Sequence, residues 1–461
     1  MIEPWPVVRR LVCQVVLVLL CGWIAIASAD PVHAQPPTPF EPVLASGPKR
    51  SDAIARPLPP IAPGTALPAI PLPEDAAYRL PAEFERQQAV MIACHELLDE
   101  VPELFAELVR ETASHVTVVA LVSDMQEYRK ARSILTRYRV RGNHVRYVTC
   151  THNTMWSRDY GPFIVEHRDG SAAVIDAEYD FNRGSDDAVP AQLARHLQLP
   201  LVQVAMRIEG GNLLSNGQGL CIATEELLLV NSERSLTEQA AAEVMRSCFG
   251  TTQLVLLEPL MGEMTGHVDM FATFTGPNTV VVAAIDPKVD PDNAAILDRN
   301  AAKLAAIRTP RGALNVVRIP MGPHSDGVWR SYTNVIYANG LLLVPIYHGI
   351  DQSGQRQALQ TYAKLLPGWR IVGLDVRALS ELGGALHCIT MNLGPAPAPQ
   401  THRLDRRLHR LLPAEQVLPA QRRLPPLSMR EHTERGSGLW NAFLPGGGMP
   451  SDWATLPPAR W

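Results

Sequence analysis

Residues 125–159 read MQEYRKARSILTRYRVRGNHVRYVTCTHNTMWSRD. Apolar side chains recur at helical spacing over 125–138, residues 145–149 are typical of a strand, and the polar motif Trp156-Ser-Arg-Asp159 follows. The same order of helix, strand and polar motif returns along the chain. Because repeats of one supersecondary unit determine an architecture, this stretch predicts the fold.

Four further copies of the unit follow the first. Their helices are expected at 189–198, 236–249, 292–308 and 354–366, and the strands after them at 201–206, 254–257, 315–319 and 370–374. Their polar motifs are Glu209-Gly-Gly-Asn212, Gly266-His-Val-Asp269, Ser331-Tyr-Thr-Asn334 and Gly383-Gly-Ala-Leu-His-Cys388. A unit of this size cannot bury both faces of its own sheet, so such units stabilise one another by closing around an axis. The expected fold is α/β, a five-bladed pseudo-symmetric propeller of ββαβ-type repeats with a central active site; generic α/β alternation is the simpler alternative.

The two ends of the chain differ from its middle. Residues 1–34 predict a secretory signal peptide, because an apolar run from Leu11 to Ala29 precedes small-residue cleavage patterns. An uncleaved membrane anchor and lipid attachment at Cys21 are the alternatives. Residues 35–80 are expected to form a proline-rich linker, since residues 31–81 contain fourteen prolines. The protein is therefore expected to be secreted or periplasmic, with no membrane span after signal cleavage.

The catalytic domain is expected at 81–395 and a proline- and arginine-rich tail at 396–461. The tail has ten prolines and nine arginines against five acidic residues, a composition that favours disorder. The whole chain has 461 residues and a net charge of −4, with 46% hydrophobic and 6% aromatic residues. This composition excludes disordered, collagenous and multi-pass membrane classes, and it gives nucleic-acid binding little electrostatic or stacking support.

Cysteine usage points to a reactive thiol. After removal of the signal peptide five cysteines remain, namely Cys94, Cys150, Cys221, Cys248 and Cys388. An odd number in an oxidising compartment leaves at least one thiol free, and a catalytic nucleophile is one reason to keep it. Cys388 follows a pair of glycines that admit close approach of a ligand, although a buried core residue is the simpler interpretation.

The polar motifs combine into one chemistry. His267 and Asp269 are expected on an extended segment with their side chains on the same side, and Asp159 in a turn after a strand. Two carboxylates suit a guanidinium, because each accepts a pair of N–H bonds and together they hold its central carbon below the Cys388 sulfur. A histidine is suited to protonate the departing nitrogen. Taken singly, each side chain has a structural interpretation as well.

These motifs resemble one family. Trp-x-Arg-Asp-x-Gly-Pro at 156–162, Glu-Gly-Gly-Asn at 209, Gly-His-Val-Asp-Met at 266 and Gly-x-x-x-His-Cys-Ile-Thr at 383 are similar to the guanidino-group-modifying enzymes, and within them to bacterial peptidylarginine deiminases and agmatine deiminases. The resemblance implies Cys388 as nucleophile, His267 as general acid and base, Asp159 and Asp269 as the guanidinium clamp and Asn334 as a polar pocket residue. Trp156 and Glu209 belong to the same motifs, and Glu209 either supports the clamp or only turns the chain.

The expected reaction is conversion of arginine to citrulline and ammonia through a thiouronium on Cys388, without cofactor or metal. Export favours peptidylarginine over agmatine, which cytoplasmic enzymes handle. Residues 179–187 resemble the segment with which the secreted bacterial peptidylarginine deiminase binds the carboxylate of a C-terminal arginine through two arginines. Here Arg183 stands first and Ser185 second, which puts strict C-terminal preference in doubt. Alternatively, Arg183 is a surface residue paired with a neighbouring aspartate.

Three other classes stay open. Two His-x-Asp pairs, at 267–269 and 324–326, would suit a metal-dependent hydrolase. Cys388 with His267 would suit a thiol protease, although the aspartates would then have no task. A non-catalytic binder of cationic peptides would need the aspartates only. No role follows from the sequence for His324 and Asp326.

Overall fold

The computed structural model describes residues 78–142, 144–180 and 182–394. The predicted signal peptide, most of the predicted linker, Cys13, Cys21 and the predicted tail lie outside the described residues. Strand β1 begins at Tyr78, so the predicted 35–80 linker ends earlier than expected. The reason is Arg79, which forms ion pairs with both Glu85 and Glu166 and ties this segment to the domain. Within the described part, no helix combines the length and the apolar character needed to cross a bilayer.

The described residues form an α/β structure with five sheets of three or four strands and one two-stranded ladder. The two four-stranded sheets have the orders β1 (Tyr78–Arg79), β5 (Phe163–His167), β6 (Ala172–Glu178), β7 (Leu201–Arg207) and β19 (Thr390–Leu393), β2 (Ala89–Ala93), β3 (Thr117–Val122), β4 (Val145–Thr149). The three three-stranded sheets have the orders β10 (Gln253–Leu257), β9 (Leu220–Thr224), β8 (Leu214–Ser215); β11 (Ala272–Gly276), β12 (Thr279–Ala284), β15 (Asn315–Pro320); and β16 (Ile336–Ala338), β17 (Leu341–Ile346), β18 (Arg370–Asp375). The two-stranded ladder pairs β13 (Arg308–Thr309) with β14 (Gly312–Ala313).

One pairing pattern recurs in all five larger sheets. Each contains an antiparallel pair whose second strand also pairs in parallel with a third strand, as in β5–β6–β7 and β16–β17–β18. A parallel partner requires a crossover, and a helix lies in each connection. The predicted ββαβ order is therefore present. In the sheet that contains β2, strand β4 adds to the far side of β3 as a fourth, parallel strand. The antiparallel partner of β2 there is β19, which comes from the other end of the domain.

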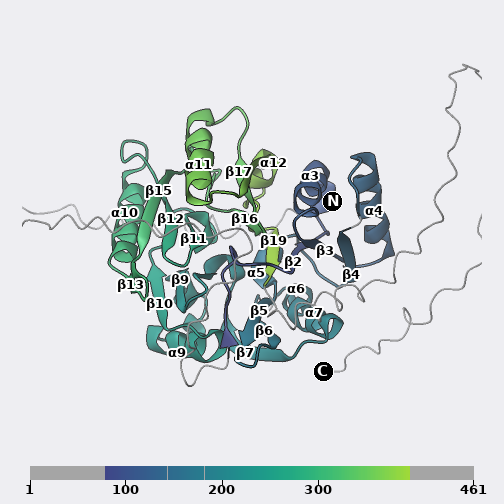
Figure 1. The fold of residues 1–461 in the computed structure, drawn as a ribbon, viewed down its shortest axis with the longest axis horizontal. Coiled ribbons are helices and arrows are strands. Elements are labelled where there is room, and N and C mark those ends of the chain that lie inside the picture. Colours follow the sequence, from purple (N-terminus) through teal and green to yellow (C-terminus); the bar gives the residue numbers. More distant parts are fainter. Residues whose placement is uncertain (1–77, 143, 181, 395–461) are drawn as a thin grey trace, which may run out of the picture. The chain divides into compact units, whose positions relative to one another are not determined.

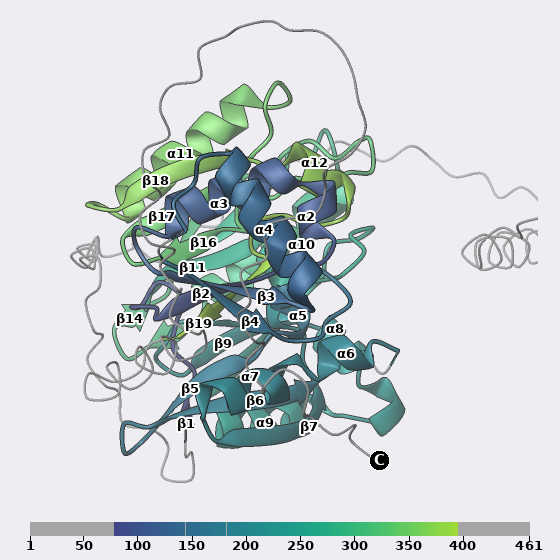
Figure 2. The same ribbon diagram turned by 90° about the vertical axis from the view of Figure 1, so that its right-hand side faces the viewer.

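The longer helices lie around the outside of the domain, and shorter ones lie nearer its centre. They are α2 (Leu97–Glu100), α3 (Pro102–Thr112), α4 (Met125–Arg137), α5 (Ser157–Tyr160), α6 (Gly184–Asp187), α7 (Val189–Leu197), α8 (Glu226–Leu229), α9 (Glu238–Phe249), α10 (Pro291–Ala305), α11 (Gln352–Leu365) and α12 (Arg377–Glu381). Short 3₁₀ helices are η1 (Gly210–Asn212), η2 (Ser232–Arg234) and η3 (Val268–Met270). In Figure 1 the longer helices α4, α7, α9, α10 and α11 lie at the periphery, whereas α5 and β19 lie between them. Figure 2 shows α3 and α4 beside the β2–β3–β4 sheet.

Side-chain caps explain where several helices start. Asp124, Asp290 and Asp351 precede α4, α10 and α11, and each carboxylate accepts a backbone N–H of the first turn. The five predicted helices are confirmed to within three residues and the five predicted strands to within one. Helix α3 was not predicted, although it begins with a proline at a first-turn position and buries Phe105 and Leu108.

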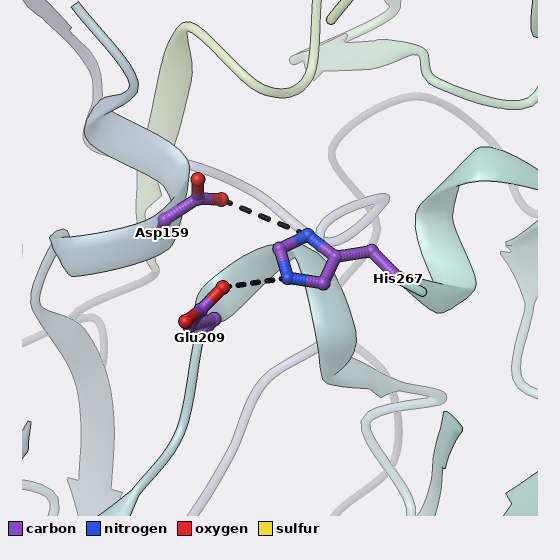
Figure 3. A group of neighbouring side chains, drawn as sticks. All are labelled: Asp159, Glu209 and His267. Atoms are coloured by element: carbon purple, nitrogen blue, oxygen red, sulfur yellow. Dashed lines mark hydrogen bonds and ion pairs between the residues drawn. The ribbon is translucent and has the colours of Figure 1, made fainter. Parts of the chain in front are cut away.

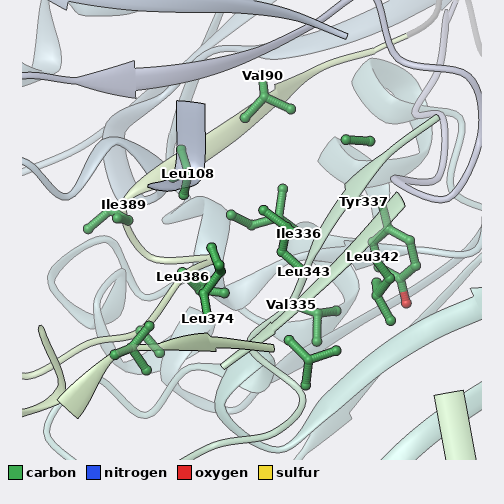
Figure 4. Packing of buried hydrophobic residues seen from close by; sticks show 14 of the residues in the cluster. Val90, Leu108, Val335, Ile336, Tyr337, Leu342, Leu343, Leu374, Leu386 and Ile389 are labelled. Carbon is green, nitrogen blue, oxygen red and sulfur yellow. The ribbon is translucent and has the colours of Figure 1, made fainter. Parts of the chain in front are cut away.

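The core consists of two clusters of buried apolar side chains. Figure 4 shows part of the larger cluster, in which residues from distant parts of the chain pack together, among them Val90, Leu108, Ile336, Leu343, Leu374 and Ile389. The antiparallel pairing of β19 with β2 runs through this region, with Thr390 opposite Ile92. The loop before β19 is consequently held against the first sheet.

Replacement of a central core residue should be costly. We expect Leu343→Ala, at a fully buried position on β17, to lower the free energy of unfolding by about 2–5 kcal/mol. The matched control Leu229→Ala, at a position 63% exposed, should change it by less than about 0.5 kcal/mol. Urea unfolding followed by circular dichroism measures both, and equal midpoints for the two variants would contradict the described core.

Candidate active site

Short segments at the ends of strands present the candidate side chains. Asp159 lies on α5, Glu209 directly precedes η1, Asp269 lies on η3, and Cys388 lies in the loop before β19. Helix α5 packs against η1 and β19, and η1 packs against η3. Four of the predicted motifs therefore meet in one place.

Arg158 holds this assembly together. Its side chain is 2% exposed, and its Nε donates to the carbonyls of Thr390 (2.8 Å) and His387 (3.3 Å). Its backbone N–H donates to the carbonyl of Cys388 (3.2 Å). Gly210 is needed beside it, because a Cβ there would lie 2.2 Å from the Arg158 carbonyl oxygen. The arginine of the Trp-Ser-Arg-Asp motif thus fixes α5 to the loop that carries Cys388.

His267 lies between two carboxylates (Figure 3). Its Nε2 is 2.7 Å from Glu209 Oε2, and its Nδ1 is 3.8 Å from Asp159 Oδ1. Burial lowers the pKa of His267, but the hydrogen bond to Glu209 and the charges of Asp159 and Asp269 outweigh it and raise the pKa to about 10. The ring is therefore an imidazolium at neutral pH.

The same arrangement raises the pKa of Asp159. Burial raises its pKa, the charges of Glu209 and Asp269 raise it further, and the cationic His267 and Arg158 oppose them. The net result is a pKa of about 7, well above that of an ordinary aspartate. Asp159 thus retains a proton over a pH range in which most carboxyl groups are ionised.

A second chain of buried charges supports Asp269. His387 Nδ1 lies 2.7 Å from Asp269 Oδ2, and its Nε2 lies 2.8 Å from Glu83 Oε2. Since both partners are carboxylates, both ring nitrogens are suited to donate, which requires the imidazolium. Burial and the nearby Arg158 lower the pKa of His387, but Glu83 and Asp269 raise it overall.

Glu83 completes this chain by contacting Arg158 Nη1. Burial raises the pKa of Glu83, yet the charges of Arg158 and His387 bring it down to about 2. The order Asp269, His387, Glu83, Arg158 alternates anion and cation, and three of the four side chains are at most 3% exposed.

Cys388 is 7% exposed and lies beside Asn334. The Asn334 Nδ2 atom is 3.3 Å from the sulfur, and the Oδ1 atom accepts the backbone N–H groups of His387 (2.8 Å) and Cys388 (3.3 Å). Burial raises the pKa of the thiol, as do the charges of Asp269 and Asp159, and the Asn334 amide only partly opposes them. The sulfur is thus a protonated thiol at neutral pH in the unliganded protein.

Two glycines allow the site to close tightly. A Cβ on Gly384 would lie 2.4 Å from the Trp156 ring and 3.1 Å from the Cys388 Cβ, so Trp156 packs on the loop of the cysteine. A Cβ on Gly211 would lie 2.5 Å from His267 Nδ1 and 3.1 Å from Asp269 Oδ2. The imidazole and the carboxylate therefore approach the backbone more closely than any other residue would permit.

One oxygen of each aspartate is left unsatisfied. Asp159 Oδ1 and Asp269 Oδ1 are buried and accept no hydrogen bond from any described residue, although Asp159 Oδ1 lies 3.8 Å from His267 Nδ1 as an ion pair. Buried polar atoms are normally paired, because an unpaired one forfeits its hydration. Two such acceptors beside a thiol indicate a place for a ligand with several N–H donors.

A comparison with protein families decides the assignment. The model of the Porphyromonas-type peptidyl-arginine deiminase family matches residues 79–394. The chain belongs to this family.

Similar proteins agree with the family. A protein named putative agmatine deiminase from Photobacterium profundum is 24% identical over 366 residues, which cover 70% of this chain and 97% of that protein. Agmatine deiminase from Medicago truncatula is 25% identical over 364 residues, or 68% and 95% of the two chains. The solved putative arginine deiminase from Porphyromonas gingivalis superposes with a TM-score of 0.61 at 24% identity, covering 69% and 99%. The solved agmatine deiminase of Enterococcus faecalis superposes with a TM-score of 0.61 at 21% identity, covering 69% of this chain and 96% of that chain. These two likenesses show a shared α/β fold.

Arg183 lies apart from the deiminase motifs. It precedes α6, is half-buried, and its carbonyl accepts the N–H of Asp187. Its charge lowers the pKa of Tyr179, a side chain whose pKa is raised mainly by burial and then by Asp159 and Glu209. The ring of Tyr179 packs edge-on against Tyr160 of α5, with centroids 5.9 Å apart, so Tyr179 lies between Arg183 and the candidate site. The alternative partners of Arg183 were Asp180, Asp186 and Asp187. In the described residues these carboxylates accept other donors: Asp180 those of Asn182, Asp186 those of Asn153 and Thr154, and Asp187 that of Tyr179.

One expectation of the sequence analysis is wrong in part. His267 and Asp269 do not share an extended segment, because η3 begins at Val268, although both side chains lie against Gly211 as expected. Asp269 bonds His387, and His267 bonds Glu209. The alternative of a metal site formed by both His-x-Asp pairs is not supported by the described residues. His324 bonds Asp290 (2.9 Å), and Asp326 forms an ion pair with Arg330 (2.6 Å).

Among the described residues one other set has the spacing of metal ligands, namely Asp159, Glu209 and His267, whose ligand atoms lie within 4.8 Å of one another. These are the same three side chains that form the hydrogen bond of Glu209 and the ion pair of Asp159 with His267. The five described cysteines are all unpaired.

Loss of the Glu209 charge should release the proton of His267. In Glu209→Gln we expect the midpoint of the His267 titration to move from about 10 toward the ordinary histidine range, because the anionic hydrogen-bond partner is gone. Nuclear magnetic resonance of the imidazole measures it. The matched control Glu225→Gln removes an exposed carboxylate and should leave the midpoint unchanged. A wild-type midpoint near 6.5 would contradict the placement of His267 between Asp159 and Glu209.

Proposed function

We propose that this protein is a hydrolase that cleaves a C–N bond of a guanidino group and releases ammonia. The observation that carries the proposal is the pair of unsatisfied buried oxygens, Asp159 Oδ1 and Asp269 Oδ1, in a site that also holds Cys388 and His267. A guanidinium offers planar N–H donors to two carboxylates at once. The family assignment supports the same reaction class.

The charge of the site favours a cationic substrate. Four carboxylates, of Glu83, Asp159, Glu209 and Asp269, face three cations, of Arg158, His267 and His387. The group lacks one positive charge, and Asp159 accommodates the excess by retaining its proton. A bound guanidinium supplies the missing charge, ionises Asp159 and lowers the pKa of Cys388.

The proposed chemistry has two stages. The Cys388 thiolate attacks the guanidinium carbon, a C–S bond forms, and the His267 imidazolium transfers its proton to the nitrogen that departs as ammonia. The now neutral His267 takes a proton from water, whose oxygen attacks the thiouronium carbon. The C–S bond breaks, the thiolate leaves and takes up the proton of the hydroxyl group, and the products are a urea group and the resting thiol. The high pKa of His267 supports the first stage, in which an acid is required.

For the substrate we propose arginine within or at the end of a peptide. The predicted signal peptide supports it, because an exported deiminase would meet proteins, and we propose secretion or the periplasm on the same ground. Arg183, bordering the site through Tyr179, is a candidate partner for a substrate carboxylate. Agmatine is the second candidate, since relatives named for it align over 95–97% of their length.

We also propose that the five ββαβ units close around an axis as a propeller. The repeated strand order of the five sheets supports this arrangement, and so does the meeting of motifs from separate units at α5, η1 and η3.

Incubation with arginine peptides and with agmatine tests the function. Wild-type protein should release ammonia and add about one mass unit to the substrate, because nitrogen is replaced by oxygen. Cys388→Ala should lower turnover to background, since loss of a nucleophile costs many orders of magnitude. The matched control Cys248→Ala, which removes another free thiol, should keep wild-type activity. Turnover by Cys388→Ala near the wild-type rate would overturn the proposal.

A further inference from the structure

Exposed apolar side chains gather around one loop. Of the eight large hydrophobic side chains exposed in the described residues, four belong to this region: Met264 (83%), Val289 (63%), Met261 (55%) and Leu382 (41%). Together these four side chains form what we name the apolar rim. Single exposed apolar residues are ordinary, but a contiguous group of them marks an interaction surface.

Contacts tie together the segments that carry these four side chains. The Met264 Cε atom lies 3.4 Å from the Cβ position of Gly383, the residue after Leu382. Met261 donates its N–H to Asn293 Oδ1 (2.8 Å), and Asn293 Nδ2 donates to Asp290 Oδ2 (2.7 Å), next to Val289. Trp329 donates to the Gly262 carbonyl (3.1 Å) and stacks on His324, which is bonded to Asp290.

The loop that carries the two methionines is held in place. Glu263 turns its carboxylate onto its own loop, where Oε2 accepts the N–H groups of Thr265 (3.0 Å) and Gly266 (2.7 Å) and the Thr265 hydroxyl (2.8 Å). Met264 is therefore presented to solvent by an ordered turn. Because the backbone of this turn is already ordered, little backbone entropy is lost when a ligand covers Met264.

The rim adjoins the candidate active site. Met264 is three residues from His267 along the chain, and Gly383, which it contacts, is followed by Gly384 against Trp156 and the Cys388 Cβ. The rim thus lies beside the loop that carries the nucleophile, within reach of residues that flank an arginine held by Asp159 and Asp269. Agmatine has no apolar branch to cover this surface, whereas a peptide has side chains on either side of its arginine.

We propose that the apolar rim is a specificity subsite that binds an apolar side chain next to the arginine of a peptide substrate. The inference rests on the proposed deiminase function and narrows its substrate class to arginine with a bulky apolar neighbour. Met264 is the central residue, because it is the most exposed and contacts the loop of the nucleophile. Its unbranched thioether adapts to side chains of different shape.

Paired peptides test the subsite. The substrates are acetyl-Leu-Leu-Arg-Leu-Leu and acetyl-Ser-Ser-Arg-Ser-Ser, the same two sequences ending at arginine, and agmatine. Wild-type protein should prefer the leucine peptides about ten-fold in kcat/KM, chiefly through KM, as expected for apolar contacts of this size. Met264→Ser should reduce the preference to within about two-fold and leave the rate with serine peptides and agmatine unchanged.

The control separates the subsite from stability and from the function itself. Leu201→Ser removes an exposed leucine (37%) at the start of β7, the end of that strand opposite Glu209, and should keep the wild-type preference; thermal unfolding checks that both variants fold. Equal rates for leucine and serine peptides, or a preference that survives in Met264→Ser, would overturn the subsite while deimination stands. Absence of turnover on every guanidine would instead reject the proposed function.

Discussion

The site depends on a charge imbalance that is buried together with it. Carboxylates outnumber cations by one across two neighbouring sets taken together, Asp159–His267–Glu209 and Asp269–His387–Glu83–Arg158, and burial makes each unpaired charge expensive. The protein accommodates the excess in Asp159, whose pKa rises to about 7, and in Cys388, which stays a thiol. Both effects favour the arrival of one planar cation, and the same cation would prepare the nucleophile.

The backbone that carries this group is shaped by close contacts rather than by long elements. The side chains lie on single helical turns and loops, and these are fixed by the buried Arg158 and by glycines at 210, 211 and 384. Pairing of β19 with β2 brings the cysteine loop from one end of the domain to the strand at the other. A substrate would thus meet residues from four distant motifs whose positions are set by the fold.

The sequence predicted the helices and strands well because their signals are local. Amphipathic spacing at 125–138 and an apolar run at 145–149 need no partner to be recognised. The candidate residues Asp159, Glu209, His267, Asp269, Asn334 and Cys388 were found because each stands in a short polar motif. Glu83 and His387 were missed as partners, since 304 positions separate them and only the fold brings them together. The turn at Val268 was missed as well, because one 3₁₀ turn has no periodicity to detect.

The central claim is that the oxygens of Asp159 and Asp269 that accept no hydrogen bond receive a guanidinium. A crystal structure of the Cys388→Ala protein with a bound arginine peptide or agmatine tests it most directly. The account predicts guanidinium nitrogens about 2.7–2.9 Å from Asp159 Oδ1 and Asp269 Oδ1, with the central carbon facing residue 388. A guanidinium bound elsewhere, with both oxygens still unpaired, would contradict it.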